Sequence, residues 1–372
     1  MSGERSEAMR DFLERQGWGA AALAPLPGDA STRRYLRITA GGRQAMLMDQ
    51  PQGAEAPACP PGATAEQRRA LGYNAIARLA GADCGRFMAA AEYLRERGLS
   101  APAIFAADTA QGFVLMEDLG DDLYADVLAR GSDAVLLYGA AVAALARIHA
   151  ETAPALLAPD KALYAYDETA LLAEIDLMTE WFVPAVRGRA AEREEIEAHR
   201  ELWRGVLNAL PATSRVFVHR DYHAQNLLWL PQRDGTARVG VIDFQDAVAG
   251  TGSYDLISLV EDARRDVAPE LSETMTRHYL DTMALQGRPL DEEAYRAEMA
   301  VMAAQRNAKI VGIFARLFKR DAKPRYLGYL PRVWGYLNRD LEHPALAPLK
   351  TWYERVIPRE LRGSPRIEGM NP

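Results

Sequence analysis

Three polar side chains stand at a spacing suited to the transfer of a phosphate group. Asp221 follows His219 by two residues, and Asn226 follows Asp221 by five. Asp243 comes seventeen residues after Asn226, directly behind the apolar run 239–242. Carboxylate and amide oxygens are the ligands that Mg²⁺ prefers, and a carboxylate can also take the proton of an attacking hydroxyl. The pattern therefore predicts phosphoryl transfer assisted by a divalent cation.

The spacing matches the catalytic loop and the metal-binding aspartate of kinases. In this interpretation Asp221 accepts a proton or a hydrogen bond from the acceptor hydroxyl, while Asn226 and Asp243 hold Mg²⁺ beside the phosphates of ATP. His219 is expected to brace the loop by hydrogen bonding rather than to act as the base. A His-x-Asp alone is common, so the prediction depends on the full spacing together with the strand that precedes Asp243.

A segment of small residues just before the expected strand 34–39 could cover phosphate, because small side chains let backbone N–H groups approach an anion. A turn before a hairpin is by itself ordinary. The prediction of phosphate binding depends on the position of this turn relative to the later catalytic motif. The residues predicted to contact the nucleotide here are Gly28, Asp29, Ser31, Thr32, Arg33 and Arg34.

Lysine is scarce in this chain, with five in total and the first at Lys161. Kinases commonly hold the α and β phosphates with a lysine on the third strand, where this chain has the apolar residues 46–48. Arg33 or Arg34 could replace that lysine, since a guanidinium binds phosphate through several donors. The sequence does not choose between them, and both could equally be solvated charges at a strand edge.

Apolar periodicity predicts a first lobe that is a small antiparallel sheet with a helix. Strands are expected at 34–39, 44–49, 103–107 and 113–117, with a helix at 87–97 that Gly98 ends. The segment 51–65, rich in proline and alanine, reads as a loop.

Beyond residue 119 the pattern becomes mainly helical. We therefore predict an α+β, two-lobed, protein-kinase-like fold, with a nucleotide-binding lobe at 1–118 and a catalytic and substrate-binding lobe at 119–372. Main-chain groups from Glu117 to Leu119, at the hinge, would hydrogen-bond adenine. The elements expected in the second lobe are helices at 134–149, 168–181, 190–210, 269–285, 291–318 and 331–338 and strands at 215–218, 227–230 and 239–242.

Composition excludes several classes of protein. The net charge of −7 over 372 residues gives no support for nucleic acid as a partner. Two cysteines, Cys59 and Cys84, supply no disulfide framework and read as free thiols. The N-terminus lacks an apolar signal core, and the apolar stretch 134–150 is short for a membrane span. The expectation is a cytoplasmic, monomeric protein that does not bind membranes.

The motifs resemble those of the aminoglycoside phosphotransferase and choline kinase superfamily. The matching segments are 218–226, 242–246 and 252–256, and by analogy Asp255 would tie the C-terminal lobe to the catalytic loop. The segments 28–35, 305–316 and 320–327 are similar to the anomeric sugar kinases of bacterial cell-wall recycling, which also lack the strand lysine.

That narrower resemblance implies ATP- and Mg²⁺-dependent phosphorylation of the C1 hydroxyl of N-acetylmuramate or N-acetylglucosamine. Glu174 and His223 could meet sugar hydroxyls, and Arg306 and Lys309 could meet the lactyl carboxylate of a muramic acid. Any one of these residues could instead belong to a solvated helix face.

Two alternatives remain open. The first is a kinase for an aminoglycoside, choline or another small alcohol, although the basic helix 306–320 argues against a cationic acceptor. The second is a nucleotide-binding pseudokinase, suggested by the missing lysine and opposed by the intact set of Asp221, Asn226 and Asp243.

Overall fold

The computed structural model describes residues 3–27, 32–51, 56–81, 83–210 and 215–363, and these form two compact units. The first unit comprises residues 1–148, 153–164 and 219–248, and the second comprises 149–152, 165–218 and 249–372. The catalytic segment 219–248 thus folds with the N-terminal sheet. The expected boundary between residues 118 and 119 divides the chain by function, and it stays a prediction.

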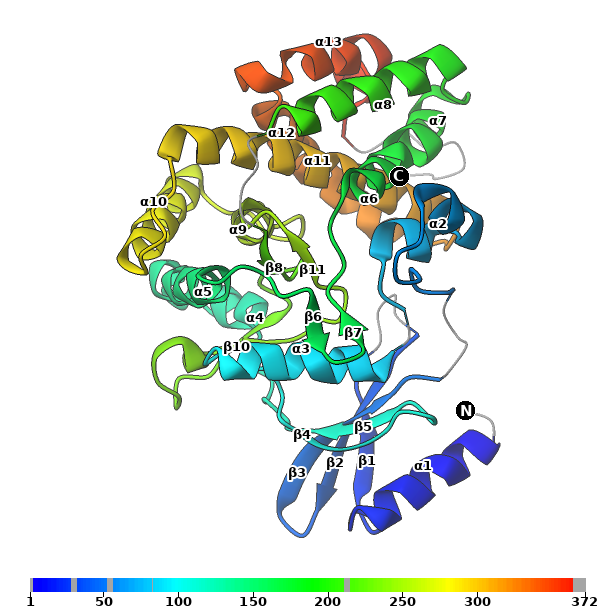
Figure 1. Cartoon of the computed structure of the whole chain (residues 1–372), viewed down its shortest axis with the longest axis vertical. Coiled ribbons are helices and arrows are strands. Elements are labelled where there is room, and N and C mark those ends of the chain that lie inside the picture. The colour runs from blue at the N-terminus through cyan, green and yellow to red at the C-terminus, as the bar shows by residue number, and fades with distance from the viewer. Residues whose placement is uncertain (1–2, 28–31, 52–55, 82, 211–214, 364–372) are drawn as a thin grey trace. The chain divides into compact units, whose positions relative to one another are not determined.

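The first unit is built on a five-stranded antiparallel sheet in the order β1-β2-β3-β5-β4. Helix α1 (Gly3–Arg15) packs Met9 and Phe12 against Ile38, Leu47 and Phe113 of the sheet (Figure 1). The expected pair of strands at 34–39 and 44–49 is confirmed, because β2 and β3 pair in register from Arg34–Asp49 to Ala40–Arg43. The strands are β1 (Ala22–Pro25), β2 (Arg34–Ala40), β3 (Arg43–Asp49), β4 (Ile104–Asp108) and β5 (Phe113–Met116).

Two helical elements follow the sheet's first three strands. Helix α2 (Ala65–Leu71) begins at a capping box formed by Thr64 and Gln67, and it leads into the π-helix η1 (Asn74–Arg78). The sequence predicted neither element. Helix α3 (Cys84–Glu96) was expected from residue 87, and it begins earlier because the Asp83 side chain accepts a hydrogen bond from the backbone N–H of Gly85.

The catalytic segment forms a hairpin in which β9 (Leu227–Trp229) and β10 (Val239–Val241) are antiparallel. Ser100 pairs with Gly240 through a parallel bridge, and its hydroxyl donates to the carbonyl of Ala237 at 2.6 Å. These bonds attach the hairpin to the chain that follows α3. The first unit also contains α4 (Tyr124–Ala129), most of α5 (Ala134–His149), β6 (Leu156–Ala158), β7 (Lys161–Ala162) and the 3₁₀ turn η3 (Gly235–Arg238).

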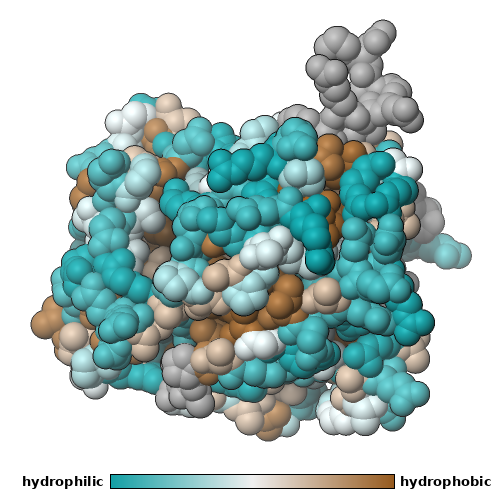
Figure 2. All heavy atoms as spheres, turned by 90° about the horizontal axis from the view of Figure 1, so that it is seen from above, coloured by the Kyte–Doolittle hydropathy of each residue, from teal (hydrophilic) through white to brown (hydrophobic). Residues whose placement is uncertain are grey.

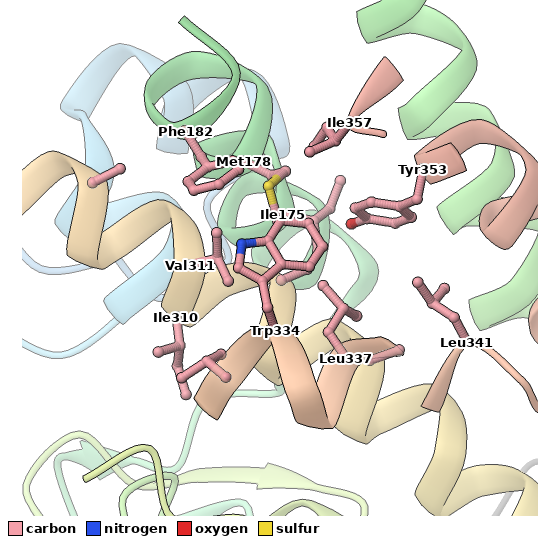
Figure 3. Close-up of a cluster of buried hydrophobic side chains, with 14 of the residues drawn as sticks. Ile175, Met178, Phe182, Ile310, Val311, Trp334, Leu337, Leu341, Tyr353 and Ile357 are labelled. Atoms are coloured by element: carbon pink, nitrogen blue, oxygen red, sulfur yellow. The ribbon is translucent and has the colours of Figure 1, made fainter. Parts of the chain in front are cut away.

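The second unit is mainly helical, with a core around Trp334, Phe182, Ile175 and Val311 (Figure 3). Helix α11 (Glu292–Lys319) contributes many of the buried residues of this core. The elements of the second unit are α6 (Glu168–Leu177), the π-helix η2 (Met178–Phe182), α7 (Val183–Arg187), α8 (Arg193–Asn208), α9 (Ser253–Val260), α10 (Pro269–Leu285), α11, α12 (Leu330–Asp340), α13 (Ala347–Val356), the 3₁₀ turns Pro324–Tyr329, Pro344–Leu346 and Arg359–Leu361, and the short strands β8 (Val216–Val218) and β11 (Val248–Gly250).

Gly312 permits the close approach of α11 to the end of α6. A Cβ atom at residue 312 would lie 2.5 Å from the backbone carbon of Leu177, a distance that real side chains do not adopt. The π-helical turn η2 follows directly, so the expected helix 168–181 continues with a wider turn in the place where α11 crosses it.

The surface of the second unit around α8 and α13 is mainly hydrophilic. Figure 2 views the molecule from the side on which α8 and α13 lie in Figure 1, and hydrophilic side chains predominate there. Arg193 and Glu197 of α8 form an exposed ion pair at 2.7 Å, which agrees with the charged start of this helix. Among the described residues, no helix has both the length and the apolar character that a membrane crossing requires.

His199 gives the second unit a pH-dependent stability. Its Nε2 accepts a hydrogen bond from the indole N–H of Trp203 at 3.0 Å, and its ring stacks on Trp352 at 4.2 Å between ring centres. Burial lowers the pKa of His199 to about 3. The folded protein thus keeps this ring neutral at pH values where the unfolded chain takes up a proton.

We predict that this difference destabilises the fold as the pH falls below the ordinary histidine pKa. At pH 5.5, His199 should reduce the free energy of unfolding by about 1.4 kcal/mol relative to pH 7.5. Urea unfolding of the wild type and His199→Gln at both pH values measures this, because all other titrating groups are common to the two proteins. Equal losses of stability in both would contradict the prediction.

Candidate active site

The catalytic segment begins with a histidine that braces the backbone. His219 Nε2 lies 2.9 Å from the carbonyl of Ile242, and its Nδ1 accepts the backbone N–H of Asp221 at 3.3 Å. A ring that donates at Nε2 and accepts at Nδ1 is neutral. It therefore connects the loop that carries Asp221 to the strand that ends before Asp243, as the sequence predicts for this residue.

Asn226 brings the two acidic residues together. Its amide nitrogen donates to the backbone carbonyl of Asp221 at 2.9 Å and lies 3.5 Å from Asp243 Oδ2. These contacts use the amide nitrogen, and cation binding by the side-chain oxygen of Asn226 stays a prediction. Three residues that the sequence singled out are thus neighbours within one unit.

The site holds Asp243 at an electrostatic cost. Exclusion of water by the surrounding protein and the negative charge of Asp221 raise the pKa of Asp243, and the guanidinium of Arg33 opposes them. Even so, half of the Asp243 side-chain surface is exposed. The carboxylate is therefore accessible to a ligand from solvent.

Backbone conformation adds strain at the same place. Arg220 has φ 76° and Asp243 has φ 65°, in the left-handed region that non-glycine residues rarely adopt. Such conformations persist only where surrounding contacts enforce them, and they gather at functional sites. The amide of Gln245 supplies one such contact, donating to Asp243 Oδ1 at 2.8 Å.

Arg33 and Arg34 point to different partners. The buried Arg33 lies with Nη1 3.9 Å from Asp243 Oδ1. Arg34 instead donates to Asp49 Oδ2 at 2.7 Å, and Asp49 also receives Arg5. Arg34 is the first residue of β2, where it pairs in register with Asp49 of β3, whereas Arg33 lies just before the strand. Arg33 is the residue that the fold places beside the acidic pair.

The other residues predicted to bind nucleotide are only partly described. Gly28, Asp29 and Ser31 lie outside the described residues, and Thr32 is exposed. Glu117, at the expected hinge, donates its backbone N–H to the carbonyl of Ala103 at 2.8 Å.

The backbone N–H of Glu117 is thus already bonded, and its carbonyl and the main-chain groups of Leu119 are the predicted partners of adenine. The Glu117 carboxylate is held by Arg233 Nη2 at 2.5 Å. Arg37 binds both Asp118 and Asp121, at 2.5 and 2.8 Å, and so attaches the hinge segment to β2. Nucleotide binding by Glu117 and Leu119 stays a prediction.

Two of the residues predicted to bind sugar meet each other in the second unit. Lys309 Nζ lies 2.8 Å from Glu174 Oε1, and Glu174 is fully buried. Glu174 also accepts from Tyr166 and from the amide of Gln305. Lys309 in addition reaches the hydroxyl of Tyr254 at 3.2 Å. The pair is a neutralised buried network rather than a solvated helix face.

The remaining two candidates have structural contacts. Arg306 is buried and donates to the Ser258 hydroxyl at 2.8 Å and to the carbonyl of Glu261 at 3.4 Å. His223 is buried in the first unit, where its carbonyl accepts the backbone N–H of Asn226 at 2.8 Å. Sugar binding by either residue stays a prediction, and the contacts of Arg306 give it a structural role in α11.

Asp255 was expected to tie the catalytic loop to the C-terminal lobe. Its carboxylate lies 3.6 Å from His149 Nε2, and the other ring nitrogen of His149 is 2.8 Å from the Tyr279 hydroxyl. Asp255 is thus part of a buried polar cluster in the second unit, and the expected tie to the catalytic loop stays a prediction.

Sequence reasoning missed the residues that support the loop behind Asp243. Arg78 Nη2 lies 2.8 Å from Asp246 Oδ2, and the buried Arg86 donates to the backbone carbonyls of Gln245 and Ala247. Burial would raise the pKa of Asp246, but the charges of Arg78 and neighbouring arginines lower it below the usual value. The only available signal was the absence of lysine, which leaves buried cationic positions to arginine.

The donor set suits a divalent cation. Carboxylate oxygens of Asp243 and the amide oxygen of Asn226 are hard ligands of the kind that Mg²⁺ takes, and one or two protein carboxylates suffice because Mg²⁺ retains water. Exclusion of water and the charge of Asp221 both raise the pKa of Asp243, and a cation bound at its carboxylate would favour the ionised form.

Comparison with known proteins agrees with this geometry. Residues 22–297 match the model of a family described as "Phosphotransferase enzyme family". The chain belongs to this family. It is 44% identical over 366 residues, covering 97% of this chain and 99% of the relative, to a protein of Caulobacter vibrioides named N-acetylmuramate/N-acetylglucosamine kinase. A Pseudomonas putida protein of the same name is 31% identical, covering 92% of this chain and 91% of the relative.

Solved structures confirm the kinase-like fold of this phosphotransferase. A choline/ethanolamine kinase family protein from Mesorhizobium loti has a TM-score of 0.55 at 16% identity, covering 94% of this chain and 99% of the other. The ADP-bound aminoglycoside phosphotransferase APH(2'')-Ib has a TM-score of 0.54 at 15% identity, covering 91% of this chain and 97% of the other. At this identity the likeness concerns the fold.

We predict that two neighbouring aspartates affect stability in opposite directions. Because the folded protein raises the pKa of Asp243, its ionised form costs stability at pH values above that pKa. Asp243→Asn should therefore melt at the wild-type temperature or up to roughly 2 °C above it at pH 7.5. Asp246 has a lowered pKa, so its ionised form stabilises the fold and Asp246→Asn should melt lower.

Differential scanning calorimetry without nucleotide or metal measures both variants. Adding Mg²⁺ and ADP should raise the melting temperature of the wild type and not that of Asp243→Asn. A clear loss of stability in the nucleotide-free Asp243→Asn protein would contradict the electrostatic account of the site.

Proposed function

We propose that this phosphotransferase uses ATP and Mg²⁺ to phosphorylate the anomeric C1 hydroxyl of N-acetylmuramate or N-acetylglucosamine. What carries the proposal is the meeting of Asp221, Asn226 and Asp243 in a chain that is 44% identical, over 97% of its length, to a protein named as a kinase of these two sugars. The product would be a sugar 1-phosphate of the kind used in the recycling of cell-wall sugars.

In the proposed mechanism Asp221 orients the C1 hydroxyl and accepts its proton. The hydroxyl oxygen forms a bond to the γ-phosphorus of ATP as the bond to the β,γ-bridging oxygen breaks, and ADP leaves. An anomeric hydroxyl is more acidic than an ordinary alcohol, so a carboxylate is a sufficient base. Asn226 and Asp243 would hold Mg²⁺, which would supply positive charge to the phosphates when bound. His219 keeps the loop in place and does not exchange the proton.

Arg33 lies where it could replace the lysine that kinases commonly carry on the third strand. It is buried, and its Nη1 lies 3.9 Å from Asp243, where a guanidinium could contact phosphate through several donors. Arg34 is engaged with Asp49. The proposal therefore assigns phosphate binding to Arg33 and a structural role to Arg34.

The acceptor specificity is a separate part of the proposal. The Glu174–Lys309 pair with Tyr166, Tyr254 and Gln305 offers hydroxyl, carboxylate and ammonium groups that could read a polyhydroxyl ligand. Lys309 is already neutralised by Glu174, so a carboxylate on the substrate would meet a balanced pair rather than a lone cation. The monomeric state and the cytoplasmic location expected from the sequence stay predictions.

We predict that the wild type converts N-acetylmuramate or N-acetylglucosamine to a 1-phosphate in the presence of ATP and Mg²⁺. Phosphorus NMR of a panel containing both sugars, an aminoglycoside, choline and ethanolamine identifies the acceptor and the phosphorylated position. Turnover of only a cationic alcohol would contradict the acceptor class. Nucleotide binding without turnover of any acceptor would favour the pseudokinase.

Asp221→Asn should still bind nucleotide but lose activity by at least about 100-fold, the usual contribution of a general base. Asn keeps the size of the side chain and removes its ability to take the proton. Equilibrium binding of ADP controls for the integrity of the site. Near-wild-type turnover by this variant would remove Asp221 from the proposed role.

The two adjacent arginines provide a matched pair. Arg33→Gln should raise the KM for ATP and lower kcat, because it removes a charge beside the phosphates, while the KM for the sugar stays within about 2-fold. Arg34→Gln should leave the KM for ATP unchanged and lower the melting temperature, since it breaks the ion pair with Asp49. The reverse result would give the phosphate-binding role to Arg34.

A further inference from the structure

Each residue of the loop 244–247, which follows Asp243, contacts a side chain from the segment 74–87. Phe244 stacks on Phe87 with ring centres 4.9 Å apart. Arg86 donates to the carbonyl of Gln245 at 3.2 Å and to that of Ala247 at 2.7 Å. Between those two contacts, the side chain of Asp246 receives Arg78. Four consecutive residues are therefore fixed by three side chains.

Arg86 is committed to this loop. It is buried, and its third hydrogen bond goes to the carbonyl of Ala162, while its guanidinium lies 4.8 Å from the centre of the Tyr164 ring. A buried guanidinium is tolerated only where its donors are satisfied. Backbone carbonyls satisfy it here, so the contacts define the path of the main chain rather than the identity of its side chains.

A third arginine connects this network to the catalytic loop. Arg220 donates to the carbonyl of Arg78 at 3.0 Å and to that of Ala77 at 3.2 Å. The backbone that carries Arg78 is thus held by the residue next to Asp221. Leu79, Arg220 and Asp243 all have positive φ, at 71°, 76° and 65°. Strained residues at three connected points indicate that the network enforces a particular loop geometry.

Helix α3 lacks the acidic residue that a lysine–glutamate pair would require at this place. Its two glutamates, Glu92 and Glu96, are exposed. Lys161, the one lysine in the sequence of the first unit, pairs with Asp83 at 3.0 Å. The buried face of α3 instead presents Arg86 to the loop.

We propose that Arg78 and Arg86 are positioning residues that hold Asp243 in its cation-binding geometry. They act through the backbone of residues 245 and 247 and the side chain of Asp246. The inference rests on the proposed role of Asp243 as a Mg²⁺ ligand. It predicts that these arginines control cation affinity without touching the cation, nucleotide or sugar.

The test is the affinity of the protein for Mn²⁺ in the presence of ADP, read by electron paramagnetic resonance without any turnover. Arg78→Gln should weaken Mn²⁺ binding about 10-fold, the usual effect of removing a residue that orients a metal ligand. Arg78→Lys, which keeps the charge and loses the double contact, should fall between. Arg69→Gln, an exposed arginine on α2, is the matched control and should bind Mn²⁺ as the wild type does.

Arg86→Lys tests the main-chain contacts, since one ammonium cannot reach all three carbonyls. It should also weaken Mn²⁺ binding about 10-fold. In steady-state assays both variants should need more Mg²⁺ for half-maximal rate, with the KM for the sugar within about 2-fold of the wild type. A purely structural role would lower the melting temperature and leave the Mn²⁺ affinity of the folded protein unchanged.

Asp243→Asn separates this inference from the proposed function. If Asp243→Asn loses Mn²⁺ binding and the arginine variants do not, the positioning role is wrong and the metal site stands. If Asp243→Asn binds Mn²⁺ normally, the metal site itself is misplaced and the inference falls with it. Should Arg78→Gln fail to fold by circular dichroism, Arg78→Lys decides, and wild-type affinity in that variant overturns the proposal.

Discussion

Asp221 and Asp243 are neighbours in the first unit, and the negative charge of Asp221 opposes the ionisation of Asp243. Burial and like charge both oppose ionisation, as the raised pKa of Asp243 records. Asn226 contacts both residues without adding charge, and the Arg33 guanidinium lies 3.9 Å from Asp243 Oδ1. A divalent ion bound at these oxygens would stabilise the ionised carboxylates, and this stabilisation would contribute to its binding free energy.

Because lysine is scarce in the first unit, arginines supply its buried positive charges. A guanidinium is planar, stays charged when buried and offers five donors, so one side chain can bind a carboxylate or several backbone carbonyls. Arg78 takes the first task and Arg86 the second. An ammonium is a compact charge and could not define the path of a loop in the same way.

The second unit buries charge under a different constraint. Glu174 is fully buried, and an isolated carboxylate there would be too costly without partners. Lys309, Tyr166 and Gln305 satisfy it together. Because the polar groups come from α6, from α11 and from the chain just before α6, the network also connects the two helices that pack at Gly312.

The local features of the site followed from the sequence. Asp221 and Asn226 are five residues apart, and the hairpin that returns the chain to Asp243 is short, so spacing alone predicted their meeting. The strands at 34–39 and 44–49 and the helix at 269–285 were likewise readable, because periodicity and turn residues act over a few positions. Helix α2 and η1 were missed, since the preceding segment is rich in proline and alanine.

What the sequence by itself determined was that Asp221, Asn226 and Asp243 meet, because a short loop and hairpin bring residues at this spacing together. Only the tertiary structure placed Arg33 rather than Arg34 beside Asp243, because the pairing of β2 with β3 brings Arg34 to Asp49. It alone revealed Arg78 and Asp246 as partners, because 168 residues separate them and no local pattern encodes a contact made by packing two distant segments.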